Sequence, residues 1–314
     1  MPRKTEGDRR WSVEELYDEL GSFEEALLDA ELREHGSHLR RSHYLLPALA
    51  RGRLRARRAG WFVIDWNGRE IDAARSRGGV LALADFSDNL IHSDVAQPWP
   101  PPAIVQKLYE SRQARAFDEP DLAAVTSRLG IYSDLQSLHS EDAITWSYFG
   151  PLMVDAPSTR AGFLNWLVER LDLPWTENHS CSIDLWRRVP HPDKSLPGGP
   201  ELDFVLDGDR CVVFGEAKWL SGEGRGQGRA GDKGQMQLRR EFFAKNGPAV
   251  YGEREFVVLG VSRSEGDLAD SGGDGGGSAV TRSISWADLG AFDGHPKQDE
   301  FGRYLEWKTS HSRL

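Results

Sequence analysis

The amino-acid sequence predicts an α/β protein, and two observations lead to this prediction. The chain has 314 residues, of which 39% are hydrophobic, so it can bury a substantial core. In its second half, two helical patterns precede three strand-like segments, and another helix and strand follow. This order favours a mixed central sheet flanked by helices. The length, at roughly 150 residues per domain, favours two domains.

The first part of the chain is predicted to be an α-rich (α+β) module. Apolar residues that recur every three or four positions predict helices over 11–35, 104–117 and 122–138. Aromatic and aliphatic runs predict strands at 61–66 and 80–86, before a proline run that ends at Pro102. We place this module at residues 1–125 and a second domain at residues 126–314.

An Arg-rich segment distinguishes the N-terminal module. Seven Arg and no Asp or Glu occur over residues 37–60. Arg51, Arg55 and Arg58 share one face if the segment is helical, and such a row could follow a nucleic-acid backbone. A solvated helix face explains the same pattern equally well.

Helices and strands follow one another in the second domain. Helical patterns cover 140–149, where Gly150 and Pro151 are expected to end the helix, and 159–171 and 235–245. Strands are predicted at 183–189, 201–206, 211–219 and 255–261. A four-residue loop at 207–210 would pair Leu206 with Cys211.

Three charged residues on the central strands form the candidate catalytic site. Glu216 and Lys218 project from one face of a strand, and the expected register places Asp203 as the diagonal neighbour of Glu216. Burying these charges unpaired would be costly, and Mg²⁺ resolves that cost. Asp203, Glu216 and the carbonyl of Ala217 are the expected ligands. Lys218 would orient the attacking water, so phosphodiester hydrolysis is expected.

The string from Pro200 and Asp203 to Glu216-Ala217-Lys218 resembles the active-site signature of the PD-(D/E)XK nuclease superfamily, with its restriction-endonuclease-like fold. The resemblance covers residues 130–262. It implies Mg²⁺, with Mn²⁺ as a substitute, and nucleic acid as substrate, DNA rather than RNA. The family's core-opening helix implies Glu141 as a further catalytic and metal-binding carboxylate, and a Gln on the next helix implies Gln235 or Gln237.

The chain departs from this family in two places. Pro200 and Asp203 are not adjacent, and the positions four residues after the two Gln are Arg239 and Glu241 rather than Tyr. The second departure counts against the exonuclease-type branch. A glycine-rich loop with Arg225, Arg229 and Lys233 is expected to contact the phosphate backbone, although a plain surface loop fits equally well.

Other interpretations of these residues stay open. Glu216 and Lys218 could pair on a solvent-facing sheet. Glu141 follows Ser140, so helix capping and the helix dipole would favour an acid there whatever the function. The chain could also be a catalytically inactive nuclease-like fold that binds nucleic acid or acts as a scaffold, or it could be a small-molecule phosphoesterase.

Composition excludes some classes of protein. A net charge of -10 argues against a nucleic-acid packaging protein. The sequence contains no GxxxxGK[ST] motif, so NTPase activity is not expected. No run reaches the roughly 18 to 20 apolar residues that cross a membrane, and the N-terminal residues lack a secretory pattern. With two cysteines, a reducing cytoplasm is expected. A homodimer or a partner protein stays open. Restriction, defence against foreign DNA and repair are all compatible uses.

Overall fold

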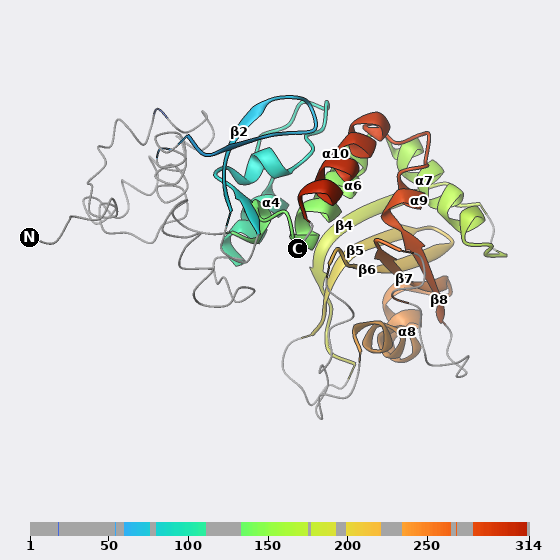
Figure 1. Ribbon diagram of the computed structural model, residues 1–314. Helices are drawn as coiled ribbons and strands as arrows, with labels where there is room; N and C mark the ends of the chain where they lie inside the picture. The colour runs from blue at the N-terminus through green and yellow to red at the C-terminus, as the bar shows by residue number, and fades with distance from the viewer. Residues whose placement is uncertain are drawn as a thin grey trace, which may run out of the picture. The chain divides into compact units, whose positions relative to one another are not determined.

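A computed structural model describes residues 60–75, 80–110, 133–174, 177–192, 199–220, 234–264 and 279–312, with the single residues Asp18, Leu54 and Leu268. It contains a five-stranded mixed sheet, a three-stranded antiparallel sheet and helices (Figure 1), which confirms the predicted α/β class. The predicted helix at 11–35 and the predicted boundary at residue 125 lie outside the described residues. None of the helices described is long and apolar enough to cross a membrane.

The chain divides into two compact units. Unit 1 comprises residues 1–90, 96–143 and 306–314, and unit 2 comprises residues 91–95 and 144–305. Each unit therefore collects segments that are far apart in the sequence. The five-stranded sheet belongs to unit 2.

Unit 1 contains the small antiparallel sheet. It is formed by β1 (Phe62–Ile64), β2 (Glu70–Arg75) and β3 (Leu81–Leu83) in that order. β1 and β3 lie within the predicted strands, whereas β2 was not predicted. The Asp65 carboxylate accepts the N–H groups of Asn67 and Arg69, both at 2.8 Å, and so forms the turn between β1 and β2. Short helical segments complete the described part: η3 (Phe86–Asn89), α4 (Pro102–Glu110) and η4 (Asp134–Gln136).

Two predicted helices end differently in the structure. The described end of the helix predicted over 122–138 is the 3-10 turn η4, with Ser133 at its N-terminus. The helix α6 (Glu141–Val154) does not end at Pro151 but continues through it. Leu152 is fully buried beyond the proline, and its packing outweighs the backbone hydrogen bond that Pro151 cannot donate.

The sheet of unit 2 has the strand order β4-β5-β6-β7-β8. The first three strands are antiparallel, and β6, β7 and β8 are parallel. The strands are β4 (Cys181–Arg188), β5 (Glu201–Gly208), β6 (Cys211–Ala217), β7 (Glu255–Ser262) and β8 (Ala279–Ser285). The other helices are α7 (Pro157–Arg170), α8 (Gln235–Tyr251), α9 (Trp286–Leu289) and α10 (Gln298–His311).

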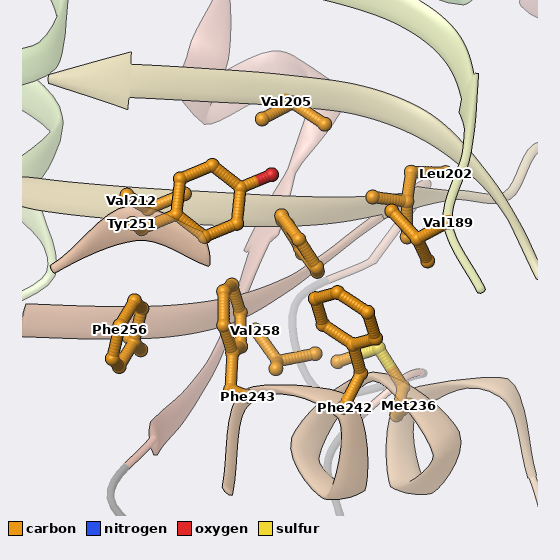
Figure 2. Packing of buried hydrophobic residues seen from close by; sticks show 11 residues of the cluster. Val189, Leu202, Val205, Val212, Met236, Phe242, Phe243, Tyr251, Phe256 and Val258 are labelled. Carbon is orange, nitrogen blue, oxygen red and sulfur yellow. The ribbon is translucent and has the colours of Figure 1, made fainter. Parts of the chain in front are cut away.

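Helices cover both faces of this sheet. On one face, Phe242 and Phe243 of α8 join Phe214 of β6 in a hydrophobic cluster (Figure 2), with the rings of Phe214 and Phe243 3.9 Å apart. On the other face, Phe149 of α6 stacks on Phe204 of β5 at 4.1 Å, and α7 lies against β4 and β5. The α8 cluster fixes the helix against β6, next to Glu216.

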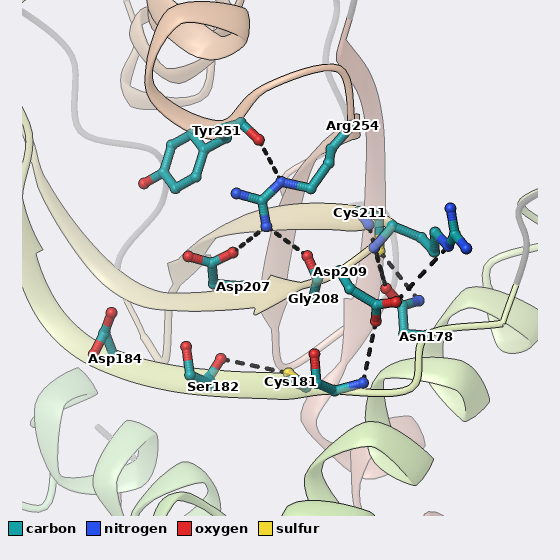
Figure 3. A network of polar contacts seen from close by, with 12 residues as sticks. Asn178, Cys181, Ser182, Asp184, Asp207, Gly208, Asp209, Cys211, Tyr251 and Arg254 are labelled. Carbon is teal, nitrogen blue, oxygen red and sulfur yellow. Dashed lines mark hydrogen bonds and ion pairs between the residues drawn. The ribbon is translucent and has the colours of Figure 1, made fainter.

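A polar network closes the hairpin between β5 and β6 (Figure 3). The Asn178 side-chain oxygen accepts the N–H groups of Arg210 (3.0 Å) and Cys211 (3.3 Å), and Arg254 bonds Asp207 and the Gly208 carbonyl. These bonds hold a two-residue loop at 209–210. Leu206 therefore pairs with Val213, and the predicted pairing with Cys211 was wrong by two residues.

Candidate functional site

The corrected register brings the two carboxylates closer than the predicted register did. Phe204 pairs with Gly215, so the next position places Asp203 across from Glu216 rather than across from Phe214. Glu216 lies near the end of β6, and Lys218 follows one residue after the strand. The convergence of Asp203, Glu216 and Lys218 that the sequence predicted is present.

Glu216 is the centre of the site. Its side chain is fully buried, with one carboxylate oxygen 2.6 Å from the Lys218 Nζ and the other in an ion pair with Arg239. The pKa of Glu216 is raised to about 7, because burial and the nearby Asp203 charge outweigh the opposing effect of Arg239 and Lys218. Glu216 and Lys218 do not form an exposed pair on a solvent-facing sheet.

The backbone holds the two neighbours of Glu216 in place. The N–H of Ala217 donates to the Asp203 carboxylate at 2.7 Å, which ties β5 to β6 through a side chain. The N–H of Lys218 donates to Val261 of β7 at 2.7 Å, and its carbonyl accepts from the Trp286 indole at 2.9 Å. The Ala217 carbonyl stays a predicted metal ligand.

Arg239 is the residue that the sequence prediction missed. It lies on α8, is fully buried, and donates to the Glu201 carbonyl at 2.9 Å as well as pairing with Glu216. Residues four apart share one helix face, so Gln235 lies on the same face as Arg239. The four-residue spacing of Gln235 and Arg239 was the signal for Arg239 that the sequence offered. Gln237 lies only two residues from Arg239 and does not share this face, so the same spacing distinguishes the two glutamines.

The two predicted glutamines differ in their surroundings. The side-chain oxygen of Gln235 is buried and has no hydrogen-bond partner. Gln237 is exposed, and its amide lies 3.4 Å from the Glu241 carboxylate. The site therefore favours Gln235 over Gln237.

Unsatisfied polar atoms concentrate at this place. Nine buried side-chain nitrogen and oxygen atoms among the described residues have no hydrogen-bond partner, and five of them belong to Glu216, Gln235 and Arg239. Both Glu216 oxygens nevertheless lie in ion pairs with Lys218 and Arg239, so the buried oxygen of Gln235 and two nitrogens of Arg239 are the atoms here that have no polar partner. Buried polar atoms are rarely left in this state, and an ion or bound water is a common explanation.

The donor set fits a magnesium ion with few protein ligands. No group of three or more His, Cys, Asp or Glu among the described residues could hold a metal, so Asp203 and Glu216 are a pair of carboxylates. Mg²⁺ is usually bound through one or two carboxylates, with water and phosphate oxygens completing its shell. The pair therefore suffices for this ion, whereas it would not suffice for a metal bound by protein ligands alone.

The predicted third carboxylate begins α6 in unit 1. Burial lowers the pKa of Lys308 to about 7, and the charge of Glu141 opposes this shift. An acid in this first turn also suits the helix dipole. The role of Glu141 at the metal stays a prediction.

A backbone distortion lies next to Asp203. Leu185 pairs with Phe204 and Arg187 with Leu202, so Trp186 lies across from Asp203, and its φ of 53° is in the left-handed region. Its ring stacks on Trp146 of α6 at 6.2 Å, which is the face opposite α8. Regular alternation would place it on the Asp203 face, so the distortion keeps the bulky indole away from the site.

The predicted nucleic-acid-binding residues lie outside the described residues. They are Arg51, Arg55, Arg58, Arg225, Arg229 and Lys233. Their contact with a phosphate backbone stays a prediction. No protein-family model, curated protein or solved structure matches the chain. The resemblance to the PD-(D/E)XK superfamily therefore depends on the residues and their geometry.

Proposed function

We propose that the protein is a metal-dependent nuclease that hydrolyses phosphodiester bonds, preferably in DNA. The observation that carries this proposal is the buried Glu216 carboxylate, in contact with Lys218 and close to Asp203. A mixed five-stranded sheet with helices on both faces supports a restriction-endonuclease-like fold. Restriction, defence against foreign DNA and repair would all use this activity.

Each residue of the site has a distinct role in this proposal. Asp203 and Glu216 would hold Mg²⁺, which supplies an activated water and screens the charge of the phosphate. The Lys218 ammonium, held 2.6 Å from Glu216, orients the attacking water and stabilises the negative charge that develops on the phosphate. Gln235 positions water or a phosphate oxygen at the start of α8.

A cleavage assay tests this function. Purified protein is incubated with end-labelled double-stranded DNA, single-stranded DNA or RNA, in Mg²⁺, Mn²⁺ or EDTA. We expect metal-dependent cleavage that falls at least about 100-fold in Asp203→Asn and in Lys218→Met, because each removes a group that acts on the metal or water. Asp184→Asn and Lys245→Met make the same chemical changes on exposed side chains and should retain activity.

Two results would contradict the proposal. Substrates that stay intact in both metals would exclude nuclease activity on these polymers. Cleavage that persists in Asp203→Asn and Lys218→Met would assign the activity to another site or another protein. Circular dichroism of each variant confirms that the fold is retained.

One observation favours a catalytically inactive relative as the second candidate. Lys218 and Arg239 already neutralise the carboxylates without a metal, as a purely structural charge cluster would do. Such a protein would shift oligonucleotides in a binding assay and leave them intact in every metal. Hydrolysis of mononucleotide esters without cleavage of polymers would instead indicate a small-molecule phosphoesterase.

A further inference from the structure

The charges at the candidate site balance without any metal. With Glu216 ionised, Asp203 and Glu216 carry two negative charges, and Lys218 and Arg239 carry two positive charges in contact with Glu216. Arg239 is fully buried, so water does not screen its guanidinium. A guanidinium remains charged in proteins, whatever its surroundings.

Adding a divalent cation to this neutral cluster leaves two uncompensated positive charges in a buried place. Excess buried charge is unfavourable because the low dielectric strengthens repulsion and removes hydration. Each phosphodiester brings one negative charge, so one phosphate offsets half of this excess and two neighbouring phosphates of a polymer offset all of it. The cation and the phosphate should therefore bind more tightly together than either binds alone.

The contacts of Arg239 are consistent with joint binding of the cation and the phosphate. Its Nη2 group makes both the ion pair with Glu216 and the hydrogen bond to the Glu201 carbonyl. Its Nε and Nη1 groups are buried and have no hydrogen-bond partner. Donors without partners inside a protein point to a bound water or anion that is part of the working state.

We propose that Arg239 is a positioning residue that makes divalent-metal binding at Asp203 and Glu216 depend on a bound phosphodiester. Arg239 and Lys218 contact the same Glu216 carboxylate that the metal would use. With the phosphodiesters of a polymer bound, their negative charges offset these two cations, and the metal takes the carboxylates. This inference rests on the proposed metal-dependent function and adds the linkage between its two ligands.

A purely structural role for Arg239 makes a different prediction. A guanidinium that only compensates Glu216 would stabilise the fold, and its removal would change the stability of the protein. It would not change the factor by which an oligonucleotide tightens metal binding. That factor, measured as a ratio of two dissociation constants in one buffer, separates the two roles.

The test measures Mn²⁺ binding by electron paramagnetic resonance, with and without a cleavage-resistant phosphorothioate oligonucleotide. In the wild-type protein we expect the oligonucleotide to lower the Mn²⁺ dissociation constant by about tenfold or more, and Mn²⁺ to tighten oligonucleotide binding by the same factor. In Arg239→Gln this factor should fall at least about threefold. Lys245→Gln removes an exposed cation from the same helix and should keep the wild-type factor.

Several outcomes would overturn the inference. These are a wild-type factor below about two, an unchanged factor in Arg239→Gln, or a factor that survives in Asp203→Asn, which would place the metal elsewhere. Should Arg239→Gln fail to fold, Lys218→Met removes the other cation and must lower the factor instead. Cleavage without linkage contradicts this inference alone, whereas linkage without cleavage in any metal contradicts the nuclease function alone.

Discussion

At the scale of single residues, the ion pair of Glu216 and Arg239 should control the stability of unit 2. Both side chains are fully buried, so removing Glu216 leaves the Arg239 charge without its partner, and removing Arg239 leaves Glu216 with Lys218 alone. We expect Arg239→Gln or Glu216→Gln to cost about 3 to 5 kcal/mol of unfolding free energy. The double variant should cost less than the sum of the two, because it leaves no unpaired charge.

Urea unfolding of the four proteins in this cycle measures the interaction. Lys245→Gln breaks an exposed pair with Glu241, whose atoms are 3.9 Å apart, and should cost below about 1 kcal/mol. Additive costs in the double variant would show that Glu216 and Arg239 do not depend on each other in the folded protein.

The sequence predicts the acidic and basic residues of the strands better than it predicts their helical partner. Strand alternation is short-range, so Glu216 and Lys218 could be placed together from their spacing alone. Arg239 reaches Glu216 only because the α8 aromatic cluster fixes that helix against β6. Gln235 differs from Gln237 for the same reason, since only the packed helix shows which side faces the sheet.

At the scale of elements, Gly215 allows β6 to pack against β5 beside the site. A Cβ at this position would lie 2.1 Å from the ring of Phe204, which itself stacks on Phe149. We expect Gly215→Ala to cost about 1 to 3 kcal/mol in urea unfolding, because the ring cannot move away without losing that stack.

A smaller side chain at position 204 should relieve this overlap. Phe204→Leu shortens the side chain, and the double variant with Gly215→Ala should be less destabilised than the sum of the single costs. Gly162→Ala on α7 is the matched control, since a Cβ there meets nothing within 4 Å. A strictly additive double variant would contradict the overlap as the cause.

The elements show where prediction from sequence succeeds and where it fails. The strands β4 to β7 and the helices α7 and α8 occur where their apolar patterns predicted them. The predicted β5–β6 register was wrong because Asn178, 32 residues before Arg210 in the sequence, closes the turn. α6 continues past Pro151 because tertiary packing outweighs a local preference.

At the scale of the whole molecule, the two units are assembled from segments that are not contiguous. Unit 1 takes residues 306–314 from the end of the chain, and unit 2 takes residues 91–95 from the first half. Local patterns carry no information on such pairings. Each unit buries groups whose pKa is displaced, among them His295 in unit 2 and Lys308 in unit 1, and these two titrate over different pH ranges.

In unit 2, His295 contributes a stability that falls below pH 6.5, and Glu216, whose pKa is raised to about 7, contributes in the opposite sense over an overlapping range. Burial lowers its pKa from 6.5 to about 4, although Asp155 opposes this shift. Its Nδ1 accepts the Lys297 N–H at 3.0 Å, so a proton at Nδ1 would face another donor. The folded state therefore resists protonation, and stability present above pH 6.5 is lost as the pH falls toward 4. The contribution of His295 to the unfolding free energy is about 3 kcal/mol, and His295→Gln should remove its pH dependence between pH 4 and 6.5.

In unit 1, Lys308 should give an alkaline limb, over which stability also rises with pH. Burial lowers its pKa from 10.5 to about 7, and its Nζ donates to the Leu138 carbonyl at 2.7 Å. The folded state then binds a proton less readily than the unfolded state between pH 7 and 10.5. Stability from this group is complete above pH 10.5 and is lost as the pH falls to 7, by roughly 3 to 5 kcal/mol.

Urea unfolding between pH 4 and pH 10 measures both limbs in one series. Lys308→Met should flatten the alkaline limb and leave the acid limb, whereas His295→Gln should do the reverse, because the two groups belong to different units. Lys245→Met removes an exposed ammonium and should leave both limbs unchanged. An alkaline limb that survives in Lys308→Met would mean that Lys308 is charged in the folded protein, and the Glu141 carboxylate would then have to compensate it.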